Sequence, residues 1–302
     1  MAQAQTNASR PINPLPLTFG ACKTDNVSLM AQAISMASSP GSRNTVQEVI
    51  QKGLRRSVAR GAARVLTYLL DQGADISTIT AGSIVNKEEL VEPSCEVLEM
   101  LIARGWDIDS RGPDSSNMPL LWFVTRYPDV LAWCLAHGAS VDLPCDIRPV
   151  LESAAASGTV ATFELLRARG ASLGRRTLHR AVEQAATCAP FGDYVRDALF
   201  EERMDMVRHV VDSVGLNVNV EELWPGNFCS TPLCCVACRS NIRNARELIW
   251  FLLDRGADPN HCPLVGDIKA QNALEHAQSC GNTRFLEAVK EWQARQHNNT
   301  TT

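Results

Sequence analysis

Apolar side chains recur along this chain in short helical stripes, and a glycine follows each stripe. In one stretch Val65, Leu66 and Leu69 fall three and four residues apart, and Gly73 comes shortly after. Spacings of three and four place side chains on one face of an α-helix. Glycine just beyond the last apolar residue is a common helix end. The pattern therefore predicts short amphipathic helices joined by tight turns.

The unit of stripe and glycine returns at a nearly constant interval. Residues 69–76 have related versions at 101–108, 134–141, 165–172 and 252–259. The glycines Gly73, Gly105, Gly138 and Gly170 are 32, 33 and 32 residues apart. A fixed period of this length indicates stacked repeat units. One helix pair buries too little apolar surface alone, so stacking on its neighbours must stabilise it.

The chain resembles the ankyrin repeat family on this period and on a second motif. Thr231-Pro232-Leu233-Cys234 and Arg176-Thr177-Leu178-His179 are close to the Thr-Pro-Leu-His start of that repeat. The resemblance implies an all-α solenoid of about seven to eight irregular helix-turn-helix repeats. Long loops and degenerate repeats also look like stand-alone ankyrin repeat proteins of filamentous fungi.

The resemblance also sets the expected boundaries of the array. Residues 1–14 are expected to be a flexible tail, residues 15–295 the repeat array, and residues 296–302 a second flexible tail. The first repeat, 15–44, is degenerate. Loop insertions are expected near 186–202, 219–230 and 240–245, where the glycine interval is longer.

Two local details follow from the repeat template. Gly158 and Gly170 should end the first and second helix of one repeat, with left-handed backbone expected at Gly158. The mixed-charge run from Asp193 to Arg203 should form a solvated helix face.

Charge and hydropathy exclude several classes of protein. The net charge is −4, which argues against a nucleic-acid partner because such a protein needs clustered basic residues. The sequence contains no run of 18 apolar residues, so we expect no membrane span. The polar residues 1–9 do not resemble a secretory signal. The eleven cysteines lack framework spacing. We therefore expect reduced thiols in a cytoplasmic protein, with the nucleus as the alternative compartment.

The cysteines Cys229, Cys234, Cys235 and Cys238 are the densest unusual cluster. Cys235 and Cys238 are three residues apart, so both thiols could face one metal ion. Cys234, however, fills the Thr-Pro-Leu-His position, and small thiols pack well in tight cores. We expect packing, with no metal and no cofactor. The chain also lacks the Gly-x-Ser-x-Gly, His-Glu-x-x-His and P-loop motifs, so a non-catalytic role is favoured.

The resemblance places ligand contacts on the concave face and the loop tips. Carried over position by position, the candidate binding residues are Arg56, Arg60, Trp106, Trp122, Arg148, Arg180, Glu183, Trp224, Arg239, His261 and His276. Tryptophan and arginine are enriched in interface hot spots. The alternative for Trp122 is that it fills a gap in the stack.

Two functions of different class remain open. The favoured one is an interaction protein that binds a protein partner through the concave groove and loop tips. The alternative is a protein that binds a small organic ligand and acts as a cyclase, isomerase or accessory factor in fungal natural-product biosynthesis. That alternative predicts a closed apolar pocket under the insertion around residues 191–194.

Overall fold

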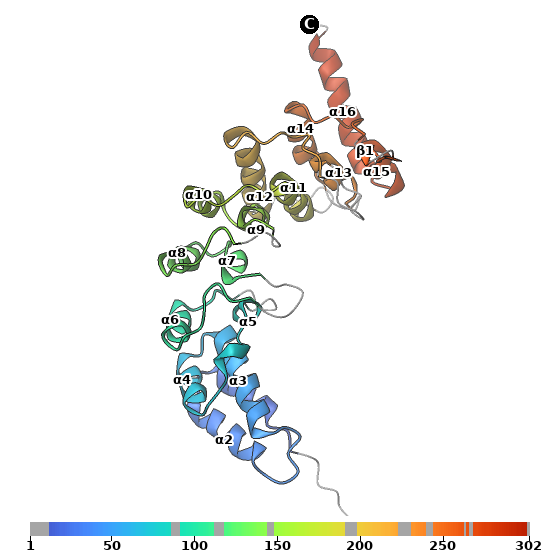
Figure 1. The fold of residues 1–302 in the computed structure, drawn as a ribbon. Coiled ribbons are helices and arrows are strands. Elements are labelled where there is room, and N and C mark those ends of the chain that lie inside the picture. Colours follow the sequence, from blue (N-terminus) through green and yellow to red (C-terminus); the bar gives the residue numbers. More distant parts are fainter. Residues whose placement is uncertain are drawn as a thin grey trace, which may run out of the picture. The chain divides into compact units, whose positions relative to one another are not determined.

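The computed structural model describes most of the chain. The described residues are 12–85, 91–111, 118–143, 148–190, 198–222, 231–239, 244–262, 264–265 and 268–300. The chain divides into two compact units, Met1–Ser140 and Val141–Thr302, each built from helix pairs (Figure 1). Each unit is described by itself.

The first unit consists of short helices connected by turns. They are α1 (Leu15–Lys23), α2 (Val27–Ala37), α3 (Val46–Arg60), α4 (Ala63–Asp71), the 3₁₀ turn η1 (Ile76–Thr78), α5 (Ala81–Ile84), α6 (Cys95–Ala103), α7 (Leu120–Phe123) and α8 (Pro128–Ala136). The sequence explains where α3 begins. The Thr45 hydroxyl accepts from the Glu48 backbone N–H and the Glu48 carboxylate accepts from the Thr45 N–H, which satisfies two free donors.

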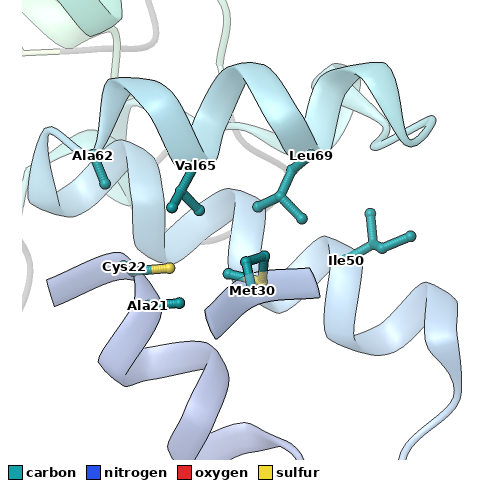
Figure 2. Packing of buried hydrophobic residues seen from close by; sticks show 7 residues of the cluster. All are labelled: Ala21, Cys22, Met30, Ile50, Ala62, Val65 and Leu69. Atoms are coloured by element: carbon teal, nitrogen blue, oxygen red, sulfur yellow. The ribbon is translucent and has the colours of Figure 1, made fainter. Parts of the chain in front are cut away.

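Apolar side chains from four helices fill the core at the start of this unit. Figure 2 shows Ala21, Cys22, Met30, Ile50, Ala62, Val65 and Leu69 gathered between α1, α2, α3 and α4. Leu69 and Val65 belong to the stripe that the sequence pattern singles out, and both are fully buried. Burying a side chain of this size stabilises the fold by about 1.5–3 kcal/mol.

The second unit continues the alternation of first and second helices. Its elements are α9 (Val150–Ser157), α10 (Val160–Ala168), α11 (Thr177–Cys188), α12 (Ala198–Arg208), the π-helical turn η2 (His209–Ser213), α13 (Pro232–Ala237), α14 (Arg246–Asp254), β1 (Leu264–Val265), β2 (Ile268–Lys269), α15 (Ala273–Ser279) and α16 (Thr283–Thr300). The first helices stack in order, α9 on α11, α11 on α13 and α13 on α15. Strands β1 and β2 pair antiparallel.

The predicted all-α repeat fold is confirmed. In the described part of the chain α1 to α16 form eight successive pairs, in line with the seven to eight repeats expected. One short strand pair, β1 and β2, is the exception to purely helical structure.

The glycines of the repeat do not all work in the same way. Gly170 has φ of +88° after α10, and Gly73, Gly105, Gly138 and Gly256 have the same left-handed backbone after other second helices. Glycine reaches this region without a Cβ clash, so the repeated motif marks a true backbone requirement. The expectation for Gly158 is wrong, because its φ is −82° and its ψ is 177°. Gly158 does follow α9, but in extended backbone that other residues also adopt.

Two side chains from later in the chain donate hydrogen bonds to carbonyls at the C-terminal ends of earlier first helices. The buried Arg203 of α12 donates to the carbonyls of Ala156, Ser157 and Gly158, at the end of α9. A cation here satisfies carbonyls without intrahelical partners and suits the negative end of the helix. Arg203 is therefore not part of a solvated face, contrary to the sequence expectation. Asn282 does the same for α13, donating from its Nδ2 to carbonyls that include those of Ala237 and Arg239.

The ends of the fold differ from the expected boundaries. The Ile12 N–H donates to the Gly41 carbonyl and the Arg43 N–H donates to the Ile12 carbonyl, so residue 12 already belongs to the folded chain rather than to a tail. Helix α16 continues to Thr300, through most of the segment predicted as the C-terminal tail. The insertion predicted at 186–202 starts inside α11 and ends inside α12, and its residues 191–197 lie outside the described residues.

Candidate functional site

Three of the predicted binding residues come together in the second unit. Arg180 and Glu183 lie one turn apart on α11, and the Arg180 Nη1 donates to the Glu183 Oε2 at 3.1 Å. Arg148 precedes α9, which packs against α11. The pKa of Arg148 is lowered, first by partial loss of solvent and then by the nearby charge of Arg180. The structure thus brings Arg148, Arg180 and Glu183 close together, and their role in binding stays a prediction.

The structure adds charged groups that the sequence did not single out. Arg176, directly before α11, donates from its Nη2 to the Glu183 Oε1 at 2.7 Å. The Arg176 Nε lies 3.1 Å from the Glu222 Oε2. The Cys235 thiol of α13 approaches the same Glu183 Oε1 at 3.7 Å. We refer to Arg148, Glu152, Arg176, Arg180, Glu183 and Glu222 as the charged cluster.

Glu152 is the most buried member of the charged cluster. It is 5% exposed, and its Oε1 accepts the backbone N–H of Arg176 at 2.9 Å. Burial raises the pKa of the Glu152 carboxyl, the charge of Glu222 raises it further, and the Arg176 N–H and the neighbouring arginines act against the rise. Gly174 allows this packing, since a Cβ there would overlap the Glu152 carboxylate.

Two of the three cations of the charged cluster, Arg148 and Arg180, are its most exposed members. The side chains of Glu183 and Glu222 are 11% and 14% exposed, whereas that of Arg180 is 31% exposed. Arg148 is also exposed. Arg176 is the exception among the cations, because its side chain is only 15% exposed. Arg148 and Arg180 thus reach solvent, while Arg176 and the carboxylates are largely buried, so the outer surface offers two guanidinium groups. Guanidinium forks of this kind suit carboxylate ligands.

One signal in the sequence could have identified Glu152. It interrupts a run of apolar and small residues, 150–156, at the position that Arg180 occupies in the next repeat. An acidic side chain in such a run is seldom fully buried unless it is paired. Glu222 gives no comparable signal, because it lies at the edge of an insertion.

Two predicted loop-tip or groove residues are buried instead. Trp106 is 6% exposed, and its indole Nε1 donates to the Ile79 carbonyl at 3.0 Å. Trp122, in α7, is 5% exposed. The prediction that either side chain contacts a partner is wrong for this structure, because both fill the interior of the first unit. This agrees with the alternative that Trp122 fills a gap.

The other predicted residues are spread over several positions. Arg56 and Arg60 lie half-buried on α3, where the Arg56 guanidinium is 5.4 Å from the centre of the Phe19 ring. Arg239 is exposed after α13. His261 pairs with Glu221 through its Nε2. His276 is 5% exposed on α15, which makes it unsuitable as a surface contact. Trp224 lies outside the described residues.

The structure gives little support to the metal-site hypothesis or to the small-ligand alternative. Within the described ranges, no three His, Cys, Asp or Glu side chains are placed to hold a metal ion. An open surface hollow is lined by Asn244, Arg246, Thr283, Arg284 and Glu287, all polar. It is not the closed apolar pocket that the small-ligand alternative predicts, and residues 191–197, which should roof that pocket, are not described. None of the described helices is long and apolar enough to cross a membrane.

Comparisons with known proteins add a similarity of fold. No protein-family model matches the chain, and no curated protein matches it. Among solved structures the chain is similar to the ankyrin repeat domain of human ASB11, with 21% sequence identity and a TM-score of 0.34, over 64% of this chain and 91% of that chain. The ankyrin-like fold therefore rests on this chain's own period, helix pairs and left-handed glycines. The resemblance to fungal ankyrin repeat proteins stays a prediction.

Proposed function

We infer that this chain is a non-catalytic interaction protein that binds a protein partner through the charged cluster. The observation that carries the proposal is that Arg148 and Arg180 reach solvent beside four largely buried charged groups, Glu152, Arg176, Glu183 and Glu222. Placing ionised groups out of water costs several kcal/mol each, and ion pairs recover little of it compared with apolar packing. A set of four largely buried ionisable groups is therefore hard to explain by stability alone, and clusters of this kind are frequent at functional sites.

The arrangement also indicates the chemistry of the partner. Glu183 holds Arg176 and Arg180 in place, so a ligand carboxylate meets guanidinium groups whose position is already fixed. Less side-chain entropy is lost on binding when the contacting group is held in advance. Acidic side chains of a protein partner fit this surface best.

A paired capture experiment tests the proposal. The baits are the wild type, Arg148→Ala/Arg180→Ala, and the control Arg167→Ala/Arg169→Ala, which removes two exposed cations from the end of α10. We expect one protein to be retained by the wild type and the control but lost with the first variant, provided that thermal unfolding shows all three to be folded. Retention of the same proteins by every bait would contradict the proposal.

Native mass spectrometry of the same baits separates the alternative function. A retained small molecule, with no protein lost in the Arg148→Ala/Arg180→Ala variant, would favour a ligand-binding or catalytic role. That result would favour the natural-product hypothesis, and the retained molecule would then be tested for conversion by the protein.

A further inference from the structure

The first helices of the chain carry a charge opposite to that of the whole protein. Residues 12–60 contain Lys23, Arg43, Lys52, Arg55, Arg56 and Arg60 against only Asp25 and Glu48. The whole chain has a net charge of −4. The beginning of the first unit therefore carries an excess of positive charge.

The two acidic side chains in this region accept hydrogen bonds from backbone N–H groups. The Asp25 carboxylate accepts the backbone N–H groups of Arg64 and Val65 at 3.2 and 2.8 Å, at the start of α4. The Glu48 carboxylate accepts from the Thr45 N–H, at the start of α3. Both carboxylates lie at helix N-termini, where backbone donors hold them. Glu48 also lies one turn before Lys52 on α3, so it offsets part of the positive charge at that end of the helix.

The basic side chains line one side of α3, next to an exposed aromatic ring of α1. Lys52 and Arg56 are one helical turn apart, and the Arg56 guanidinium lies 5.4 Å from the centre of the Phe19 ring. Phe19 is 42% exposed, and Lys23, one turn further along α1, is also exposed. The Cys22 thiol contacts the Gly53 carbonyl at 3.5 Å, which fixes α1 against α3. We call Phe19, Lys23, Lys52, Arg55 and Arg56 the basic-aromatic face.

We propose that the basic-aromatic face binds an acidic, extended peptide segment of a partner protein. Positions four apart on a helix are separated by about 6 Å along its axis. Alternate side chains of an extended peptide are separated by about 6.8 Å and point to the same side. Carboxylates at alternate positions of the peptide can therefore meet Lys52 and Arg56 together. An apolar peptide side chain beside them covers the exposed ring of Phe19.

A peptide fits this face better than a nucleic acid does. Nucleic-acid binding proteins neutralise about 6–10 phosphates, which takes more cations than Lys23, Lys52, Arg55 and Arg56 supply. The face lies in the first unit and shares no residue with the charged cluster, so the two proposals stand or fall separately.

Fluorescence anisotropy with defined peptides tests the inference. The probe is a fluorescein-labelled peptide Gly-Ser-Glu-Ser-Glu-Ser-Leu-Gly, whose glutamates and leucine share one side when extended, compared with the same peptide carrying glutamine in place of glutamate. We expect Lys52→Ala/Arg56→Ala to weaken binding about tenfold and Phe19→Ala about threefold, with weaker binding by the wild type at higher salt. The control Arg167→Ala/Arg169→Ala removes the same number of charges from the second unit and should change affinity less than about twofold.

Several results would overturn the inference. These are no binding by the wild type at ~1 mM peptide, equal binding by the double variant, or equal binding of the glutamine peptide. Tighter binding of a labelled oligodeoxythymidine than of the acidic peptide would also overturn it, because the face would then be a nucleic-acid surface. Circular dichroism of each variant checks that the exposed substitutions leave the helices intact.

Discussion

Two arginine-bearing first helices, α3 and α11, hold their cations in different ways. On α3 the guanidinium of Arg56 rests over the exposed ring of Phe19. On α11 Arg180, together with the preceding Arg176, is bound to the shielded carboxylate of Glu183. The positions within the repeat are similar, but the partners are an aromatic ring in one case and a buried anion in the other.

The difference has consequences for stability and for binding. An ion pair shielded from water fixes its members, and the loss of one member leaves the other as an uncompensated charge. A cation over a ring at the surface contributes about 0.5–1 kcal/mol and keeps more freedom. We therefore expect the charged cluster to be rigid and sensitive to substitution, and the basic-aromatic face to be adaptable and tolerant.

The largest expected effect comes from Glu183→Gln. This change leaves the guanidinium groups of Arg176 and Arg180 without their shared anion. We expect the free energy of unfolding in urea to fall by about 2–3 kcal/mol, less than for a fully buried pair because Arg180 is partly solvated. A loss below about 1 kcal/mol would show that the cluster is no more sensitive than an ordinary surface network.

A smaller loss is expected for Gly174→Ala. The new Cβ would overlap the Glu152 carboxylate and separate it from the Arg176 N–H. We expect a destabilisation of about 2 kcal/mol in chemical unfolding. The control is Gly20→Ala in α1, where a Cβ would meet nothing within 4 Å. That change should stabilise the protein by about 0.5–1 kcal/mol, because alanine favours helix. If the two substitutions had the same effect, the contact between Gly174 and Glu152 would not matter.

Glu152→Gln tests whether burial of the carboxylate acts against folding. The pKa of Glu152 in the folded protein lies above its ordinary value of 4.5, so the folded state binds more protons than the unfolded state just above that pH. The free energy of unfolding then falls as the pH rises through this interval. Glutamine keeps an acceptor for the Arg176 N–H without the charge. We expect the variant to melt about 2–4 °C higher than the wild type at pH 7 and to lose this advantage near pH 4. An advantage independent of pH would assign the effect to packing instead.

The smallest effect is expected for Arg56→Ala. Loss of the contact with Phe19 should lower the free energy of unfolding by about 0.5 kcal/mol, since both side chains are partly solvated. Urea unfolding beside Glu183→Gln measures the contrast directly. A loss as large as that of the Glu183 variant would mean that α3 and α11 do not differ in the way proposed.

Sequence reasoning succeeded where one repeat determines the result. The stripe of Val65, Leu66 and Leu69 is buried as predicted, and Gly170 has the left-handed backbone that a helix end requires. It failed where a side chain depends on a partner far along the chain. The indole of Trp106 is buried because the Ile79 carbonyl accepts its N–H, and no local pattern contains that bond.

The candidate site shows the same division. The position-by-position assignment put Arg180 and Glu183 on the concave face and Arg148 at a loop tip, and in the structure Arg180 pairs with Glu183. It did not reveal that Arg176 is held between Glu183 and Glu222, because Glu222 lies beyond an insertion that breaks the repeat register. The sequence thus singled out two of the three cations, Arg148 and Arg180, and one of the three anions, Glu183.

The hydrogen bonds of Asn282 couple local unfolding of α16 to the helix pair before it. The Asn282 Oδ1 accepts the Phe285 N–H at the start of α16, while its Nδ2 donates to the carbonyls at the end of α13. Opening of α16 thus exposes polar groups of the preceding repeat to solvent, and amide exchange there should accelerate along with that of α16 itself. A truncation before Asn282 should consequently remove more folded structure than the residues it deletes.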